Sequence, residues 1–479
     1  MINSITISGF RGFGSDVVVS LPKPNGDLGS GLFMLVGPNN SGKTSFTECF
    51  RLFNYPYSQL PTLSSDKCNS KKDGFVEITI DVVNQGRFTL QSDRQGSFLL
   101  ELLKDGVKYS SEAPFEPRVF VMQSRRYFEH YFGRNENDDK SANSRAQQFT
   151  SRSYRLEQFE QRLFKMHKEH ELFNDLLTEL YGERIEWSLV QNPSQQYQLQ
   201  IGERTLARTT EGVGDGILSL FTVCDLLYDS NEGDTLIIDE PELSLHPALQ
   251  KRVMDVLLKF SETRQIILST HSPYFISIES LTNGGMIGRA HLIDGDIQIG
   301  VLTNKTGKKL YSVSQNLNNP HIFGLDAKEV FFLSDGVVLV EGQEDVVVLR
   351  RFEIELGKKV AGTLYGWGVG GAGNFSLFMQ LLKELGFKKV TAILDGNMEA
   401  TAQALSSKYP EYQVFTIVTD DIRDKSPRTI SEKSGYATTD GKLKEQYRSD
   451  AQRLMEKIQA YQTSENFITE LNDLEISVL

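Results

Sequence analysis

Cysteine, membrane-length apolar runs and a recognisable leader are scarce or absent in this chain. The 3 cysteines, Cys49, Cys68 and Cys224, are scattered without metal-ligand spacing, which argues against a disulfide framework and a zinc site. No apolar run approaches the length that spans a bilayer. The first residues, MINSITISGFRGF, lack the basic region and apolar core of a signal peptide. We therefore expect a cytoplasmic protein without membrane spans.

The composition is that of an ordinary globular protein, with 24% charged and 39% hydrophobic residues. A length of 479 residues predicts roughly two to four domains. Proteins that simply coat nucleic acid are usually basic, so with a net charge of −12 any such contact must be local. The acidity is explained either by solubility or by carboxylates that hold metal ions, and overall charge does not separate these two explanations.

Residues 32–45, LFMLVGPNNSGKTS, form the most informative stretch. Five apolar residues predict a buried strand, and GPNNSGKT then matches the phosphate-binding pattern G-x-x-x-x-G-K-[ST] at every fixed position. The glycines let the backbone wrap around a phosphate, Lys43 adds a positive charge, and Thr44 offers a hydroxyl to Mg²⁺. The predicted nucleotide-binding residues are Gly37, Asn39, Asn40, Ser41, Gly42, Lys43, Thr44 and Ser45.

Two further strand ends supply polar groups to the same half of the chain. Residues 235–241, TLIIDEP, predict a buried strand that ends in Asp239 and Glu240. Asp239 is placed to bind Mg²⁺, and Glu240 to orient or deprotonate the attacking water. His271 follows another buried strand, where it could contact the γ-phosphate. A plain surface turn is the alternative for the two acids, and the apolar strand before them weakens it.

The rest of the first half contains antiparallel strand patterns between residues 75 and 103 and a polar stretch at 134–153. Residues 155–181 carry apolar side chains at three- and four-residue steps, which predicts a long helix. We favour a helix that packs on its own domain over a dimerising arm. The domain prediction is an ATPase domain at 1–305 with a helical arm at about 150–182, a linker at 306–330 and a second α/β domain at 331–479.

The stretches GPNNSGKT, LIIDEPELSLHP and STHSP together resemble the ABC-type ATPase family, in the DNA-repair branch that contains RecF-like and OLD-family proteins. The resemblance implies a signature loop at residues 211–216, EGVGDG, in which Gly214 would complete the ATP site of a second subunit. It implies a homodimer closed head to head on two ATP molecules, with Gln123 as the glutamine between lobes. A transporter ATPase subunit is the alternative, and the fused second domain argues against it.

In the second half, three predicted parallel strands each end in a carboxylate. Residues 337–340 deliver Glu341, residues 390–394 deliver Asp395, and a third strand ends at Asp420 and Asp421. Oxygen ligands at one sheet edge favour Mg²⁺ or Mn²⁺, and two such ions could clamp a phosphodiester. Helix capping is the alternative for such acids.

This pattern resembles the Toprim domain, and FGLDAKEVFFLSDGVVLVEG resembles the OLD-family junction between ATPase and Toprim domains. The resemblance implies that Glu341 and Asp395 are catalytic metal ligands, and it adds a lysine that stabilises transition-state charge. Lys425 is our candidate for that lysine and Lys433 the alternative. The Toprim D-x-D pattern is Asp395-Gly396-Asn397 here, and Glu399 is the alternative to the second acid. The implied metal ligands are Thr44, Asp239, Glu341, Glu344, Asp345, Asp395, Asn397 and Asp421.

Seven basic residues of the second half are either solvated surface charges or contacts to a phosphate backbone. They are Arg350, Arg351, Lys388, Lys389, Arg423, Lys425 and Arg428. Taken singly, each is best explained as a solvated surface charge. Their crowding near the acidic strand ends is only suggestive of phosphate contacts, and they form no base-reading motif.

The sequence thus predicts an α/β protein with an ABC-type ATPase domain and a C-terminal Toprim domain. Its expected function is ATP-regulated, metal-dependent cleavage of nucleic acid, DNA rather than RNA. The resemblance extends to antiphage effectors of the retron-associated and Gabija-like kinds, which implies a controlling partner such as a reverse transcriptase with its msDNA. Two alternatives stay open: a non-cleaving RecF-like DNA clamp, and a regulatory ATPase whose C-terminal domain docks a partner.

Overall fold

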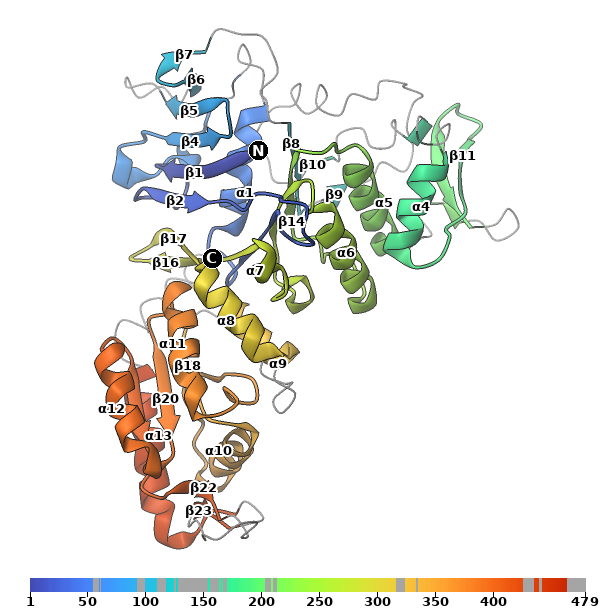
Figure 1. Ribbon diagram of the computed structural model, residues 1–479. Helices are drawn as coiled ribbons and strands as arrows, with labels where there is room; N and C mark the ends of the chain where they lie inside the picture. Colours follow the sequence, from blue (N-terminus) through green and yellow to red (C-terminus); the bar gives the residue numbers. More distant parts are fainter. Residues whose placement is uncertain are drawn as a thin grey trace. The chain divides into compact units, whose positions relative to one another are not determined.

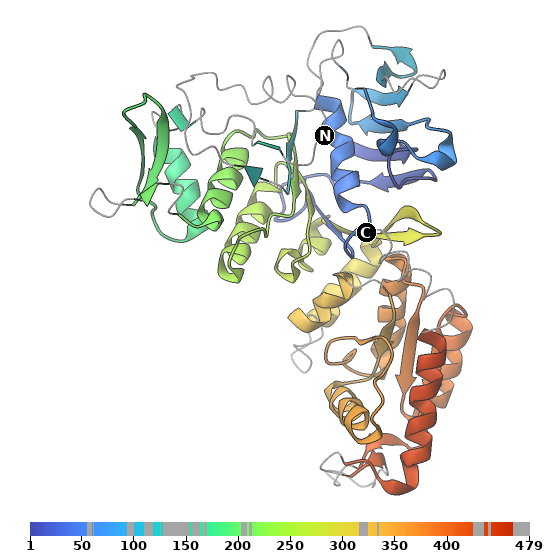
Figure 2. The ribbon, with the colours of Figure 1, turned by 180° about the vertical axis from the view of Figure 1, so that it is seen from behind.

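The computed structural model (Figure 1, and from behind in Figure 2) divides the chain into two compact units, Met1–Val301 and Leu302–Leu479. The described residues are 1–54, 60, 62–92, 100–109, 118–124, 126–127, 154–155, 163–164, 166, 170–202, 208–209, 213–315, 324–332, 335–424, 435–438 and 442–462. Among these residues, no helix has the length and apolar character needed to cross a membrane.

A mixed sheet forms the centre of the first unit, with strand order β17-β16-β3-β15-β14-β8. Five strands are parallel, and β17 pairs with β16 in the antiparallel direction. The strands are β3 (Leu32–Val36), β8 (Val119–Met122), β14 (Thr235–Asp239), β15 (Gln265–Ser269), β16 (Met286–Ile293) and β17 (Asp296–Val301). Every residue of β3, β14 and β15 is buried, as expected for continuous apolar strands covered on both faces.

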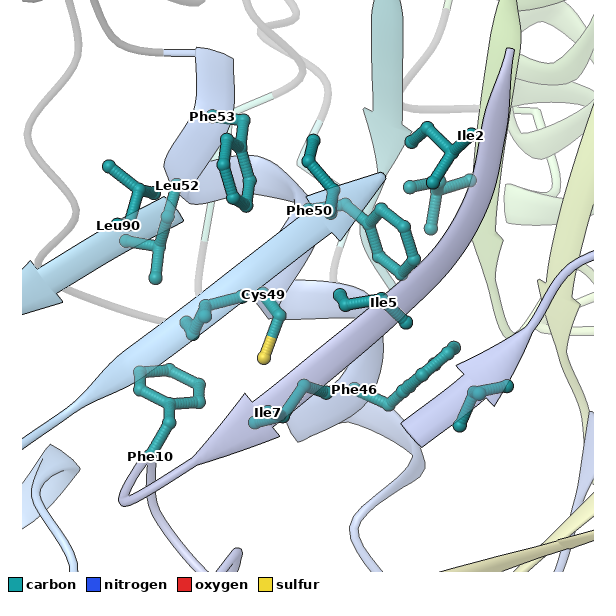
Figure 3. Close-up of a cluster of buried hydrophobic side chains, with 14 of the residues drawn as sticks. Ile2, Ile5, Ile7, Phe10, Phe46, Cys49, Phe50, Leu52, Phe53 and Leu90 are labelled. Atoms are coloured by element: carbon teal, nitrogen blue, oxygen red, sulfur yellow. The ribbon is translucent and has the colours of Figure 1, made fainter. Parts of the chain in front are cut away.

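An antiparallel sheet lies on one side of helix α1 (Lys43–Arg51), with strand order β2-β1-β4-β5-β6-β7. Its strands are β1 (Ile2–Ser8), β2 (Val17–Ser20), β4 (Glu77–Val82), β5 (Gly86–Ser92), β6 (Leu100–Lys104) and β7 (Val107–Lys108). Figure 3 shows Ile5 and Ile7 of β1 beside Phe46 and Phe50 of α1. The alternation of buried and half-buried positions in β4 is what the sequence pattern predicted.

Helices α4 (His170–Tyr181), α5 (Asp215–Tyr228) and α6 (Pro247–Phe260) pack together in the first unit. The interpretation of a helix that packs on its own domain is therefore confirmed for α4. The predicted start of this helix at residue 155 is wrong, because Tyr154–Arg155 form β10, which pairs with β9 (Arg126–Tyr127). Backbone pairing overrides the local helical pattern there. The remaining elements are β11 (Trp187–Gln191), β12 (Tyr197–Ile201), β13 (Arg208–Thr209) and α7 (Ser280–Asn283).

The second unit contains a four-stranded parallel sheet with the order β19-β18-β20-β21. The strands are β18 (Val337–Leu339), β19 (Thr363–Leu364), β20 (Val390–Leu394) and β21 (Gln413–Thr416), with the small pair β22 (Asp421–Arg423) and β23 (Gly435–Ala437). The helices are α8 (Asn304–Ser314), α9 (Leu325–Lys328), α10 (Gln343–Leu356), α11 (Phe375–Glu384), α12 (Glu399–Lys408) and α13 (Arg448–Gln462). Apolar residues of β18, α10, β20 and α13 share one core.

The region predicted as a linker, 306–330, is largely helical where the structure describes it, because α8 and α9 lie within or across it. The side chain of Thr303 accepts a hydrogen bond from the backbone N–H of Thr306 and so caps α8. Glu384 of α11 accepts bonds from the backbone N–H of Thr303 at 2.9 Å and from the hydroxyl of Thr306 at 2.6 Å. These contacts make α8 part of the second unit, which the polar composition did not indicate.

The buried amide of Gln265 joins the two sheets of the first unit. Its Nε2 donates to the carbonyls of Ile2 and Pro22, both at 2.8 Å, and its Oε1 accepts from the N–H of Ile2 and the hydroxyl of Thr235. Leucine at position 265 would leave these buried polar groups without partners. We expect Gln265→Leu to lower the free energy of unfolding of this unit by about 3 kcal/mol.

Urea unfolding measured by the fluorescence of Trp187, in a Trp367→Phe background, checks this value, because the chain has 2 tryptophans. The matched control is Gln298→Leu, since the Gln298 amide makes a hydrogen bond to the Ser15 hydroxyl in a partly exposed position. We expect the control to cost about 1 kcal/mol or less. Equal effects of the two substitutions would contradict the role given to Gln265.

Candidate functional site

The phosphate-binding loop follows β3 and depends on two glycines with positive φ. Gly37 has φ 140° and Gly42 has φ 98°. A Cβ atom at Gly37 would lie 2.3 Å from the carbonyl oxygen of Ala290, and one at Gly42 would lie 2.3 Å from Cδ1 of Ile297. Strand β16 and the start of β17 therefore leave no room for side chains at these positions, and the loop keeps its backbone close to the place where a phosphate binds.

Lys43 folds back onto this loop. Its Nζ donates to the carbonyls of Gly37 at 3.1 Å and Pro38 at 2.8 Å. Burial lowers the pKa of Lys43 to about 8, against the opposing effect of the carboxylates of Glu240 and Asp239. The buried hydroxyl of Ser41 has no hydrogen-bond partner in the described part of the chain. A phosphate would supply an acceptor to both side chains, so the loop fits the nucleotide that the motif predicts.

The register of the parallel sheet brings the predicted strand ends to one edge. Ser269 pairs with Leu35 beside the phosphate loop, Asp239 pairs with Ser269, and Met122 pairs with Ile238. Asp239 accepts hydrogen bonds from the hydroxyls of Ser269, Thr44 and Ser124. Burial nevertheless raises the pKa of Asp239. The predicted grouping of the phosphate loop with Asp239 is therefore present, and its hydroxyls and carboxylate are ligands suited to Mg²⁺.

Glu240 and His271 face one another at this edge. Glu240 has φ 50°, and its N–H donates to the carbonyl of Ser269 at 2.9 Å. Its Oε1 lies 3.8 Å from Nε2 of His271. Burial, and then the charge of Lys43, lower the pKa of His271 to about 4, so the imidazole is neutral at physiological pH. A carboxylate beside a neutral imidazole can orient a water molecule or accept a proton from that water.

Glu242 is a further residue of this edge that the sequence prediction does not include. Its carboxylate accepts from the hydroxyl of Thr270 at 2.8 Å and from the backbone N–H of His271 at 2.6 Å. Burial raises the pKa of Glu242, opposed first by the bond from the His271 N–H. Glu242 therefore fixes the end of β15 that carries His271. Its place inside the motif DEPELSLHP was the available signal.

The sequence also predicts nucleotide-site roles for Gln123 and Gly214. Gln123 follows β8 beside Asp239, and its buried Oε1 has no hydrogen-bond partner among the residues described. Gly214 is the exposed N-cap of α5, and no atom lies within 4 Å of a Cβ built there. The helix N-terminus of α5 therefore presents its backbone to solvent, as a contact to a second subunit requires.

In the second unit, the predicted carboxylates also follow neighbouring parallel strands. Glu341 lies two residues after β18 and Asp395 directly after β20, with Leu339 paired to Ala392. The prediction that the third strand ends at Asp420 and Asp421 is wrong, because β21 ends at Thr416. Asp420 is exposed, and the buried Asp421 begins β22 of a separate strand pair. The N–H of Gly396 donates to the carbonyl of Thr419 at 2.9 Å, which holds the Asp395 turn against the segment before Asp421.

Three of the other implied metal ligands have protein contacts or an exposed position. Asp345 accepts the N–H of Gly342 at 2.7 Å, so the helix-cap alternative is confirmed for it. Glu344 makes an ion pair with Nη2 of Arg423 at 2.5 Å. Asn397 is exposed in the turn after Asp395. Glu399, the alternative to Asn397, accepts the hydroxyl of Thr416 at 3.1 Å.

The prediction that the basic residues crowd near these acids is wrong for two of them. Lys388 and Lys389 precede β20, and the carbonyl of Lys389 accepts from Val337 at the amino end of β18, so both lie at the opposite sheet edge. Arg350 lies over the ring of Trp367 at 5.4 Å. Lys425, Lys433 and Arg428 lie outside the described residues.

The donor set at this edge consists of carboxylate oxygens, which suit Mg²⁺ or Mn²⁺. Glu341 and Asp395 are both half-buried and thus accessible to an ion. Within the described ranges, however, no group of three or more acidic, histidine or cysteine side chains is close enough together to hold a metal. The strands bring the acids to one edge of the sheet, but the acidic side chains that the structure describes do not lie close enough together to form a complete metal site.

These features define an ABC-type P-loop ATPase domain followed by a Toprim domain. Residues 32–277, more than half of the chain, match the family described as AAA domain, putative AbiEii toxin, Type IV TA system. Residues 332–396 match the overcoming lysogenization defect protein-like TOPRIM domain. The chain belongs to this AAA family, and its second unit contains a match to the OLD-like Toprim domain.

Two curated relatives carry matching names. The chain is 30% identical to "Old nuclease" of Escherichia phage P2 over 168 residues, which are 33% of this chain and 27% of the relative. It is 28% identical to "OLD nuclease" of Thermus scotoductus over 167 residues, which are 34% of this chain and 31% of the relative. The matches thus span about a third or less of these relatives.

Two solved head domains of SMC proteins are also similar. One, bound to the C-winged helix domain of ScpA, has a TM-score of 0.44 and 15% identity and covers 64% of this chain and 99% of its own. The other, from Thermotoga maritima, has a TM-score of 0.37 and 13% identity and covers 63% of this chain and 99% of its own. At these TM-scores the likeness carries no further argument.

The lowered pKa of Lys43 predicts a pH dependence of nucleotide binding. Bound phosphate favours the charged amine, whereas the free site loses this proton as the pH rises through about 8. We therefore expect the ATP affinity to fall by up to about tenfold per pH unit above that value. Calorimetric titrations between about pH 7 and pH 9.5 check this slope. Lys43→Arg is the control, because arginine stays charged, and a flat wild-type profile would contradict the prediction.

Glu242→Gln should slow ATP hydrolysis more than it weakens ATP binding. The amide oxygen of glutamine can accept a hydrogen bond from only one of the two donors, the Thr270 hydroxyl and the His271 N–H. Its NH2 group is itself a donor and would face the other one, so His271 loses its fixed position. We expect kcat to fall about tenfold with ATP affinity nearly unchanged, as measured by phosphate release and calorimetry. Glu279→Gln, an exposed acid on the segment after His271, should leave both values alone. Equal losses in affinity and rate would point to general damage.

Proposed function

We propose that this protein is an ATP-regulated, divalent-metal-dependent endonuclease that cuts DNA. The observation that carries the proposal is that Glu341 and Asp395 follow the paired parallel strands β18 and β20, with Asp421 at the start of β22. The names of the curated relatives support the nuclease class. A complete phosphate-binding loop in the same chain supports control by ATP.

In the ATPase unit, the residues at the sheet edge would have separate roles in ATP binding and hydrolysis. Gly37, Gly42 and Lys43 would bind the phosphates, and Thr44 with Asp239 would hold a magnesium ion. Glu240 would accept the proton of the attacking water, and the neutral imidazole of His271 would contact the γ-phosphate. Gly214 and the exposed N-terminus of α5 would complete the nucleotide site of a second copy, which makes a homodimer part of the proposal.

In the Toprim unit, Glu341, Asp395 and Asp421 would hold Mg²⁺ or Mn²⁺, which would neutralise charge on the scissile phosphate. Glu344 would join them only after its ion pair with Arg423 opens. The guanidinium of Arg423 would then become available to a phosphate oxygen of the substrate. Lys425, two residues further along the chain, remains the proposed lysine of the reaction.

A non-cleaving DNA clamp is the second candidate function. It is favoured by the uncharged Asn397 in place of an acid and by the absence of a gathered group of three metal-binding side chains in the described residues. A role as an antiphage effector, restrained by a partner such as a reverse transcriptase with its msDNA, is part of the nuclease proposal. It draws on the resemblance to retron-associated and Gabija-like proteins.

A cleavage assay on supercoiled and single-stranded DNA tests the proposal. We expect the wild type to cut in Mg²⁺ or Mn²⁺ and Glu341→Ala to show no cutting above background, because it loses a metal ligand. Glu329→Ala is the matched control, since Glu329 is an exposed acid of the same unit. It should cut like the wild type.

Lys43→Ala, assayed with and without ATP, shows how nucleotide acts on the nuclease. A changed ATP response in this variant, with cutting still present, would establish control by the ATPase unit. ATP-dependent binding of DNA by the wild type with no cutting in either metal would instead favour the clamp. Cutting by Glu341→Ala at the wild-type rate would refute the proposed nuclease site.

A further inference from the structure

The glycine-rich segment 366–374, GWGVGGAGN, has no role in the function described so far. It connects β19 to α11 and lies at the carboxyl end of β19, the strand next to β18. Gly366, Gly368, Gly370 and Gly371 have φ values of 45°, 90°, 74° and 115°, in the left-handed region. This backbone path is open to glycine and strained for other residues, so the segment has a shape that its sequence specifies.

Backbone amides of this segment bind the turn that carries Glu341. The N–H of Val369 donates to the carbonyl of Val340 at 2.9 Å, and the N–H of Gly371 donates to the carbonyl of Glu341 at 3.0 Å. These two bonds continue the pairing at the end of β18 beyond the strand itself. The main chain on both sides of the Glu341 Cα atom is thereby fixed.

Gly368 packs directly on the residue after Glu341. A Cβ atom at Gly368 would lie 2.6 Å from Cα, 2.7 Å from N and 2.8 Å from C of Gly342. All three are backbone atoms, which cannot move aside without moving the turn. On its other side, the N–H of Gly342 is bound by the carboxylate of Asp345 at 2.7 Å. The turn is therefore held between the glycine-rich segment and the first turn of α10.

The segment is itself anchored to α11 and to the core. Nδ2 of Asn374 donates to the carbonyls of Val369 at 2.9 Å and Gly370 at 3.2 Å. The N–H of Gly368 donates to the carbonyl of Tyr365 at 2.9 Å, and the buried ring of Tyr365 packs on Phe378 with 4.8 Å between centroids. Helix α11 thus supports the contacts made to Glu341.

We propose that Gly368 is a positioning residue for the carboxylate of Glu341, and that the backbone contacts of segment 366–374 hold this metal ligand in place. The inference rests on the proposed function, because it assumes that Glu341 binds a divalent ion. Metal ligands must hold their oxygen atoms within a few tenths of an ångström, and groups that orient them typically change metal affinity by about 10- to 100-fold. The main chain that carries the half-buried Glu341 side chain is held by this segment on one side and by the first turn of α10 on the other.

Binding of Mn²⁺ to the full chain without nucleotide, measured by electron paramagnetic resonance, tests the inference. The signal that Glu341→Ala removes defines the site. We expect Gly368→Ala to weaken binding at this site by about tenfold, because the new methyl group must displace the Gly342 turn. Cleavage by this variant should need correspondingly more Mn²⁺ and approach the wild-type rate at saturation.

Gly373→Ala is the matched control from the same segment. No atom lies within 4 Å of a Cβ built at Gly373, and its φ lies outside the left-handed region, so we expect wild-type Mn²⁺ binding. Asn374→Ala is a second test without a steric clash. It removes two hydrogen bonds that hold the segment, so we expect it also to weaken Mn²⁺ binding. If Gly368→Ala does not fold, Mn²⁺ binding by Asn374→Ala tests the positioning role instead.

The outcomes separate the positioning role from the proposed function. Unchanged Mn²⁺ binding by folded Gly368→Ala, with binding lost in Glu341→Ala, would overturn the positioning role alone. A loss in Gly373→Ala as large as in Gly368→Ala would overturn it too, because the effect would not depend on the Gly342 contact. Full Mn²⁺ binding by Glu341→Ala would instead overturn the metal site and the proposed nuclease with it.

Discussion

In-register pairing of parallel strands is the constraint on which both sites depend. In the first unit it aligns the ends of β3, β15, β14 and β8, so that the phosphate loop, His271, Asp239 and Gln123 reach one edge. In the second unit it does the same for the ends of β18, β20 and β21. Residues more than a hundred positions apart in the chain become neighbours because the carboxyl ends of parallel strands meet at one edge.

The two edges differ in how far their side chains are organised. At the ATPase edge, burial shifts the pKa values of Lys43, Asp239 and Glu242. Each of these side chains also has polar or charged partners, which oppose the shift and keep its position fixed. At the Toprim edge, Glu341 and Asp395 are half-buried, and Glu344 is engaged by Arg423. Burial makes the first site rigid before any ligand binds, whereas accessible carboxylates can still rearrange around an ion.

Backbone contacts compensate for this accessibility in the second unit. The glycine-rich segment and the carboxylate of Asp345 hold the turn after β18 from two sides, although the Glu341 side chain itself reaches solvent. A similar arrangement holds the Asp395 turn through the bond from the Gly396 N–H to the Thr419 carbonyl. A fixed main chain with accessible carboxylates suits the metal-dependent nuclease site proposed above.

The sequence by itself determined the two domains, the phosphate loop and the acids at strand ends, because apolar strands, glycine positions and motif spacing are local properties. It did not reveal Glu242, the helix within the predicted linker, or the distant position of Lys388 and Lys389, and it left the capping role of Asp345 as one of two alternatives. Those outcomes depend on which strand neighbours which and on what a side chain meets across the fold. Only the tertiary structure decided them, because hydrogen-bond partners such as Thr270 for Glu242 and Arg423 for Glu344 are distant in the chain.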